Sequence, residues 1–382
     1  MKSYPHMRFE RHWHIESEVQ YQLGQCSAMI SSICEIPLRP EVYGTLNTVS
    51  LIKGAQATTA IEGNTLTEHE IERVHQGETL APSKEYQEIE VRNILAAMNG
   101  ILSETLQGAD ALVAPRLIKN FHILVGKDLG EHFDAIPGHF RTDERFVGPY
   151  KCPDPRDVEE LVARLCEWLK GEFGYSAGNQ KFRDAVVAAI VCHVYLEWIH
   201  PFGDGNGRTG RLLEFYILLR AGLPDIASHV LSSFYNETRP EYYRQLDHAH
   251  NEQDLTSFLS YAIQGLRDGL QAILAQVQGS QFETAWKSYI YEQFAERRYR
   301  KVVFKRRRTL ALDLPRNSVL TLSQIPLVTP EIAKNYGGLA ERTVRRDLDS
   351  LIEMGLVRRV EGGYLANTDT LRKHMAKRAV GD

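Results

Sequence analysis

A strongly apolar stretch lies near the middle of the chain, at residues 184–199 (DAVVAAIVCHVYLEWI). Apolar residues occur on every side of its helical projection, so it predicts a helix buried in the centre of a domain. Pro201 disfavours a helical conformation at His200, so the helix should end there. Beyond a glycine-rich stretch, apolar residues return at helical spacing in RTGRLLEFYILLRAG. The pattern predicts two consecutive core helices joined by a tight bend.

The remaining pattern predicts a mainly α fold. Residues 1–110 are mostly of helical character, with a turn at residues 37–40. PRLIKNFHILVG at 115–126 predicts a further helix, and residues 157–173 predict another that packs on the central helix. Between them, residues 136–155 contain glycine, four prolines and short runs of mixed polarity. That composition predicts a small irregular β-hairpin.

Composition and charge narrow the class of protein. With 43% hydrophobic and 25% charged residues over 382 positions, the chain resembles an ordinary globular protein of two or three domains. Its five cysteines are scattered without metal-ligand spacing, and neither a signal-peptide core nor a membrane-spanning stretch is present. We therefore expect reduced thiols, a cytoplasmic location and no membrane partner.

The net charge of −4 conceals an asymmetry along the chain. Residues 297–382 contain 19 Lys and Arg but 9 Asp and Glu, a net charge of +10, which leaves −14 on residues 1–296. Such a difference between two parts of one chain indicates different partners for each.

The bend at residues 200–211, HPFGDGNGRTGR, gathers most of the chemistry. His200 is of the residue type that is neutral at physiological pH and accepts a proton from a hydroxyl. Asp204 can hold a divalent cation, and the backbone N–H groups that begin the next helix form an anion site. Arg208 and Arg211 lie one helical turn apart and can reach the same polyphosphate. This set of groups predicts nucleotide-transfer chemistry.

HPFGDGNGRTGR resembles, at every defining position, the signature of the Fic family, whose members mostly transfer AMP from ATP to hydroxyl side chains of other proteins. The resemblance implies that His200 is the general base, Phe202 a buried anchor of the loop and Asp204 the Mg²⁺ ligand. It also implies that Gly205, Asn206 and Gly207 form an anion hole. The residues that it implies bind the triphosphate are Arg208 and Arg211. His193, alone on the apolar helix, is more simply a structural residue.

A second informative stretch is TTAIEG, residues 58–63. On propensity alone, Glu62 and Gly63 are merely a helix end with a C-terminal glycine. Beside the signature, the stretch resembles the family's inhibitory motif, a Ser or Thr followed after three residues by Glu, here Thr58 and Glu62. A Glu62 carboxylate paired with Arg211 would occupy the guanidinium group meant for the γ-phosphate. The hypothesis is that Glu62 holds the enzyme in a low-activity state.

Two further groups of residues follow from the resemblance. PGHFR followed by FVG resembles the family's flap, which binds a target segment as an added strand through Phe146, Val147 and Gly148. Arg145 departs from a common form of the flap, in which an apolar residue precedes FVG. Aromatic residues at helical spacing are more often core, but the resemblance places Tyr243 and Asn251 near the adenosine.

The C-terminal part has a pattern of its own. AERRYRKVVFKRRR is basic and is by default a solvated charged face. Residues 329–367 then predict a helix, a Gly-Gly turn, a second helix and two short strands around Gly362-Gly363. This resembles a winged helix-turn-helix of bacterial repressors, which implies contact of DNA phosphates or base edges with Arg342, Arg345 and Arg346. The alternative is a protein-interaction or dimerisation module.

These observations predict four segments. They are a helical region with the inhibitory motif (1–110), a Fic-type catalytic core with its small β-hairpin flap (111–275), a basic linker or helix (276–315) and an α+β winged helix-turn-helix (316–382). The resemblance implies a protein adenylyltransferase that uses ATP and Mg²⁺ on a Ser, Thr or Tyr of a target protein or of itself. Open alternatives are a nucleotide-sensing DNA-binding regulator, use of another nucleotide and hydrolytic removal of AMP. The target and the oligomeric state, a homodimer included, stay undetermined.

Overall fold

The computed structural model describes residues 3–106, 113–173, 182–295, 297 and 300–373. The chain forms two compact units, Met1–Val277 and Gln278–Asp382. Helix α11 (Thr256–Ala295) begins in the first and ends in the second. The boundary that we predicted at residue 110, inside the first unit, stays a prediction. In the described part of the chain, no helix is long and apolar enough to cross a membrane.

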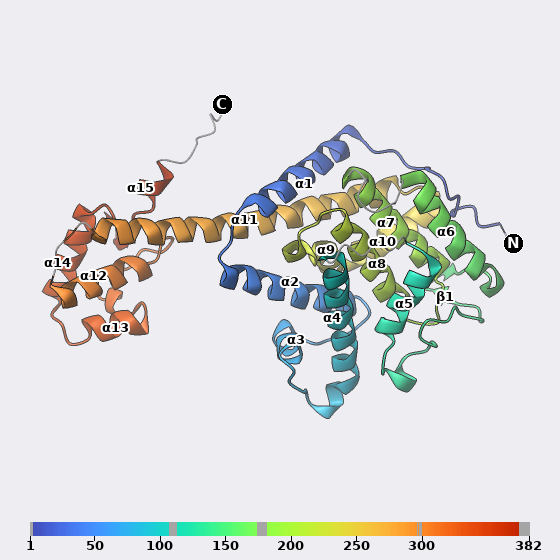
Figure 1. Cartoon of the computed structure of the whole chain (residues 1–382), viewed down its shortest axis with the longest axis horizontal. Helices are drawn as coiled ribbons and strands as arrows, with labels where there is room; N and C mark the ends of the chain where they lie inside the picture. The colour runs from blue at the N-terminus through green and yellow to red at the C-terminus, as the bar shows by residue number, and fades with distance from the viewer. Residues whose placement is uncertain (1–2, 107–112, 174–181, 296, 298–299, 374–382) are drawn as a thin grey trace. The chain divides into compact units, whose positions relative to one another are not determined.

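The first unit is built around two helices that pack on each other, α7 (Phe182–Ile199) and α8 (Asn206–Arg220). Figure 1 shows these two helices side by side. Both are buried along nearly their whole length, as the apolar pattern predicted, and α7 ends at the residue before His200. Helix α8 begins at Asn206, inside the glycine-rich stretch, so the motif arginines lie within its first two turns. The bend between the helices therefore lies against the core of the unit.

Further helices pack around this pair. Helix α6 (Val158–Phe173) packs on α7, as expected, and α5 (Pro115–Val125) and α4 (Glu85–Leu106) pack on α8. Helix α2 (Pro40–Ala60), with Pro40 at its first turn, packs on α4 and α8 and ends just before Glu62. The others in this unit are α1 (Ser17–Glu35), α3 (Glu68–His75), α9 (Val230–Glu237) and α10 (Arg239–Glu252). Short 3-10 helices lie at Pro82–Lys84, Gly130–His132, Pro155–Asp157 and Asp225–Ala227.

The predicted hairpin is present but very short. Strand β1 (Phe146–Val147) pairs antiparallel with β2 (Tyr150–Lys151), with Phe146 opposite Lys151 and Val147 opposite Tyr150. Gly148 turns the chain with φ of 56°, a conformation that favours glycine. Arg145 is paired with Asp134 and Asp143, so the charged residue before the strand is neutralised locally.

The second unit has its own apolar core and the predicted helix-turn-helix followed by a hairpin. Helix α13 (Pro330–Tyr336) is capped by the Thr329 side chain, which accepts from the Ile332 amide. Helix α14 (Glu341–Glu353) follows the Gly-Gly turn. Strand β3 (Val357–Val360) then pairs antiparallel with β4 (Gly363–Ala366). The remaining elements are α12 (Lys301–Asp313), the 3-10 helix Ile325–Leu327 and α15 (Asp369–Arg372).

The expectation of a solvated face for the basic stretch is wrong for two of its arginines. Arg306 and Arg307 on α12 are buried, and each donates through Nε to Asp347 of α14 at 2.7 Å. Asp347 is fully buried and also accepts from the Tyr336 hydroxyl at 3.2 Å. The periodicity of α12 could not reveal this role, because the neutralising carboxylate lies 40 residues along the chain from Arg307.

Candidate active site

The bend after α7 is held by its own Asn206 and by contacts with residues outside it. Phe202 is fully buried and stacks on His122, with ring centroids 3.7 Å apart. The Asn206 amide exchanges two hydrogen bonds of 2.9 Å with the backbone of Phe202, one as acceptor and one as donor. Gly205 has φ of 76°, and a Cβ there would lie 2.9 Å from the Phe133 ring. Asn206 and Gly205 therefore shape the loop whose backbone can approach a ligand.

His200 lies at the start of this bend with φ of 49°. Arg141 donates to its carbonyl at 2.7 Å, which fixes the backbone at the end of α7. Burial lowers the pKa of the His200 imidazole to about 4, although a hydrogen bond with the Glu197 backbone opposes the shift. The ring is therefore neutral at physiological pH, the state that can accept a proton.

Glu62 reaches the second motif arginine. Its Oε1 accepts from Arg211 Nη2 at 2.5 Å, and Arg211 also donates to the carbonyl and hydroxyl oxygens of Thr58 at 3.0 and 3.2 Å. Burial raises the pKa of Glu62, but the charge and hydrogen bond of Arg211 outweigh it, so the net shift is downward. A Cβ at Gly207 would lie 2.1 Å from Glu62 Oε1. The carboxylate thus occupies the space against the glycine bend.

Arg208 is also paired. It is 3% exposed, and it donates through Nη2 to Asp204 Oδ1 at 3.0 Å and through Nη1 to Glu90 of α4. Asp204 Oδ1 accepts from the Gly205 amide as well, at 2.5 Å. Each of the two motif arginines is therefore bound to a carboxylate from a distant part of the chain, Glu62 or Glu90.

A cavity of about 570 Å³ lies beside the C-terminal end of α7, the helix that leads into the bend. The flap contributes residues 147–150, α7 contributes Glu197 and Trp198, and α10 contributes Tyr243, Leu246, Asp247 and His250. The Tyr243 hydroxyl donates to the Ile61 carbonyl at 3.3 Å, beside Glu62. The volume of the cavity falls in the range of pockets that bind small molecules.

The structure brings together most, but not all, of the residues selected from sequence. Val147, Gly148 and Tyr243 line the cavity, whereas Phe146 is 61% exposed and is not among the lining residues. Asn251 is exposed, and its amide donates to Asp247 at 3.0 Å. Its neighbour His250 lines the cavity instead. Asn251 is not among the residues that line the cavity, and its contact with the adenosine stays a prediction.

Two acidic residues of the site were missed from sequence. Glu197 lies three residues before His200, and burial, reinforced by the charge of Glu62, raises its pKa to about 7 against the opposing effect of Arg211. An acidic residue within an otherwise apolar helix was a usable signal. Glu90 had no such signal, because it lies among the ordinary polar residues of α4. His193, in contrast, is fully buried with Nε2 2.9 Å from the Tyr242 hydroxyl, as expected of a structural histidine.

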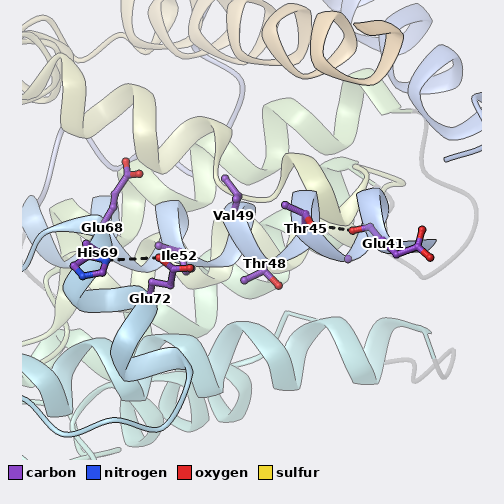
Figure 2. A pocket seen from close by; sticks show the side chains of 9 residues that line it. Glu41, Thr45, Thr48, Val49, Ile52, Glu68, His69 and Glu72 are labelled. Atoms are coloured by element: carbon purple, nitrogen blue, oxygen red, sulfur yellow. Dashed lines mark hydrogen bonds and ion pairs between the residues drawn. The ribbon is translucent and has the colours of Figure 1, made fainter. Parts of the chain in front are cut away.

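A larger hollow, of about 710 Å³, lies between α2 and α3. Figure 2 shows its lining of threonines on α2 and of His69 and Glu72 on α3, whose side chains lie 3.8 Å apart. This hollow shares no lining residue with the bend or with the 570 Å³ cavity, so it is distinct from the candidate site.

Comparison with known families agrees with this geometry. Residues 112–218 match the Fic/DOC family, and residues 326–370 match the DeoR-like helix-turn-helix domain. Residues 112–218 form a Fic/DOC family domain. The Fic match contains α5 to α7, the whole bend and all but the last two residues of α8. The C-terminal match contains α13, α14 and the hairpin of the DeoR-like domain.

The relatives of this Fic protein include adenylyltransferases. It is 31% identical over 224 residues to protein adenylyltransferase fic-1 of Caenorhabditis briggsae, which covers 58% of this chain and 41% of that one. It is 29% identical over 217 residues to protein adenylyltransferase Fic of Nematostella vectensis, which covers 56% and 47%. The chain therefore spans less than half the length of these relatives.

Solved structures share the fold. A Fic family protein from Desulfovibrio desulfuricans G20 aligns over 97% of this chain and 100% of its own, with a TM-score of 0.56 and 21% identity. Fic-1 of Caenorhabditis elegans aligns over 69% and 74%, with a TM-score of 0.53 and 23% identity. The predicted fold, a mainly helical Fic core with a small hairpin and a C-terminal helix-turn-helix, is confirmed.

Proposed function

We propose that this Fic protein is an adenylyltransferase, which transfers AMP from Mg-ATP to a hydroxyl side chain of a protein and is autoinhibited by Glu62. The observation that carries the proposal is the pairing of Arg208 and Arg211, both buried at the start of α8, with carboxylates. Phosphate oxygens, like carboxylate oxygens, are negatively charged acceptors that bind a guanidinium group through two hydrogen bonds, so a triphosphate can replace these carboxylates. The relatives named adenylyltransferases support the choice of AMP.

The residues of the bend fit the steps of the transfer. The neutral His200 imidazole accepts the proton of the target hydroxyl, whose oxygen then forms a bond to the α-phosphorus while the bond to pyrophosphate breaks. The backbone amides of residues 205–207 and the N-terminus of α8 stabilise the charge on the phosphate oxygens. The 570 Å³ cavity beside Tyr243 and His250 accommodates the nucleoside. The exposed Phe146 and the rest of β1 are free to pair with a target strand.

Asp204 fits the metal that such a reaction uses. Among the described residues, no three His, Cys, Asp or Glu gather in a way that could hold a metal ion. Mg²⁺ is commonly bound through one or two carboxylates together with substrate phosphates, so a single Asp204 at the phosphate site is a suitable ligand. When bound, the ion neutralises charge on the phosphates.

Glu62 accounts for inhibition through its position. Its carboxylate on Arg211 excludes a phosphate from the same guanidinium group and repels the others. A nucleotide displaced by about 1 Å can lose on the order of a hundredfold in rate, because in-line attack depends on orientation. Release of Glu62 then permits productive binding.

The proposal is tested with full-length protein, Mg²⁺ and ATP labelled on the α-phosphate. Wild type, Glu62→Gly and the double variant Glu62→Gly/His200→Ala are compared by label and by intact mass. The proposal expects an AMP mass increment in Glu62→Gly that is much weaker in wild type and absent from the double variant. The proposal is contradicted if the Glu62→Gly protein binds ATP but neither it nor any protein of an added lysate becomes labelled.

A second function, binding of DNA by the C-terminal unit, is favoured by α14. Arg342, Arg345 and Arg346 are all exposed on this helix, which corresponds to the recognition helix of a helix-turn-helix. Binding of duplex DNA should weaken steeply with salt, and Arg346→Ala should weaken it further. Equal binding by wild type and the triple alanine variant of these arginines would instead favour a protein-interaction module.

A further inference from the structure

The Glu90 carboxylate has three partners on three elements. Its Oε1 accepts from Arg208 and, at 2.9 Å, from the Tyr86 hydroxyl, and its Oε2 accepts from Asn64 Nδ2 at 3.0 Å. Glu90 is 6% exposed, Arg208 3% and Asn64 8%. A buried carboxylate is stable only while its charge is paired and its lone pairs are satisfied, and here both conditions are met. These contacts therefore hold Glu90 in place beside the bend.

Asn64 connects this carboxylate to the turn that presents Glu62. Its backbone amide donates to the Thr59 carbonyl at 3.1 Å and closes the turn at the end of α2. Its side chain donates to Glu90 and to the Gln87 carbonyl, and accepts from the Leu66 amide, each at 3.0 Å. Asn64 therefore binds the Glu62 turn to α4 at the same carboxylate that holds Arg208.

We propose that Glu90 is a second inhibitory carboxylate, which withholds Arg208 from the nucleotide and, through Asn64, stabilises the turn that places Glu62 on Arg211. This inference rests on the proposed nucleotide site. A phosphate that takes the Arg208 donors leaves Glu90 as a buried, uncompensated charge, which is unfavourable unless the carboxylate moves or gains water. Either change breaks the Asn64 contact and loosens the turn. Occupation of Arg208 and release of Glu62 are therefore coupled, and the coupling is reciprocal.

The test measures equilibrium binding of α,β-methylene-ATP with Mg²⁺ to the full-length protein by calorimetry, since this analogue does not release pyrophosphate. Asn64→Ala removes the connection but leaves both arginines and both carboxylates. It should tighten binding roughly tenfold, the effect of one hydrogen bond to a charged group. Glu90→Gln should act in the same direction, and its thermal unfolding is compared with wild type because it alters a buried ion pair.

Gln87→Ala is the matched control. The Gln87 side chain also joins this turn to α4, by accepting from the Thr65 amide and hydroxyl at 3.4 and 3.1 Å, but it does not contact Glu90. Gln87→Ala should bind the analogue as wild type does, within about twofold. An equal gain in Gln87→Ala and Asn64→Ala would overturn the role of Glu90, because general loosening of the turn would then suffice.

The double variant Asn64→Ala/Glu62→Gly separates coupled from independent effects. The inference expects Asn64→Ala to add less than about twofold once Glu62 is absent, because its effect passes through Glu62. Fully multiplicative effects overturn the coupling. If Glu62→Gly binds the analogue tightly and transfers AMP but Asn64→Ala behaves as wild type, this inference alone fails. If no variant binds the analogue, the proposed function fails with it.

Discussion

Replacing Glu62 by Gln tests whether charge holds the inhibitory contact. Arg211 is about 2% exposed, and its guanidinium has one carboxylate partner at 2.5 Å and two neutral oxygens of Thr58. Removing one partner of a fully buried ion pair typically costs roughly 3–5 kcal/mol, because the other charge stays buried. The Glu62 side chain is 33% exposed, so solvent screens part of this charge, and glutamine retains an acceptor oxygen while the Thr58 contacts persist. We therefore expect a loss of about 2 kcal/mol, which for a unit of this size is a fall in Tm of about 4 °C.

Glu197 makes the size of this loss depend on pH. Burial first, then the charge of Glu62, raises its pKa to about 7, while Arg211 opposes the shift. A carboxyl whose pKa is raised on folding causes stability to fall as pH rises from its unfolded pKa, about 4.3, to its folded pKa. Without the Glu62 charge, the folded pKa of Glu197 is lower and less stability is lost. The difference between wild type and Glu62→Gln should therefore be larger at pH 5.5 than at pH 8.

Differential scanning calorimetry of the full-length chain at pH 5.5, 7 and 8, with and without Mg-ATP, measures both effects. Mg-ATP should restore more Tm to Glu62→Gln than to wild type, because a ligand stabilises the form that it binds. Glu241→Gln is the control, since Glu241 pairs with Arg244 on the surface and such pairs contribute at most about 1 kcal/mol. A Glu62→Gln protein as stable as this control at every pH would refute the reasoning.

Three further outcomes are expected. The kcat/KM of Glu62→Gly should stay level down to about pH 5 and fall toward pH 4, because burial lowers the pKa of His200 to about 4. A fall in kcat/KM that begins near pH 6.5 would contradict this. Gly207→Ala places a Cβ 2.1 Å from Glu62 Oε1, so it should displace the carboxylate and also obstruct the phosphate. The variant should therefore have a lower Tm than wild type but lack the transfer activity of Glu62→Gly. Asp347→Asn leaves two buried arginines of α12 without their carboxylate, so it should lower the Tm of the C-terminal unit by several degrees. The control is Asp349→Asn, which changes an exposed residue of the same helix and should leave this Tm unchanged.

Local pattern predicted the elements that depend on local chemistry. The apolar run of α7, the proline after His200 and the helical spacing beyond Arg208 were sufficient to place two core helices and the bend between them. The family signature named the residues of that bend, and the TTAIEG stretch named Glu62 as a partner of Arg211. The helix-turn-helix and its hairpin were equally accessible, because a Gly-Gly turn and two short strands leave a clear sequence pattern.

Long-range pairing was decided by the tertiary structure. Glu90 meets Arg208 across 118 residues, Asp347 neutralises two arginines on another helix, and His250 rather than Asn251 faces the cavity. A charged residue on a helix has the same local pattern whether it faces solvent or a buried partner. The distinction depends on which helices pack together and on how each is rotated about its axis. Successive residues of a helix point about 100° apart, so a shift of one position turns a side chain toward a different neighbour. The sequence determined the chemistry available at the bend, and packing determined which carboxylates occupy its arginines.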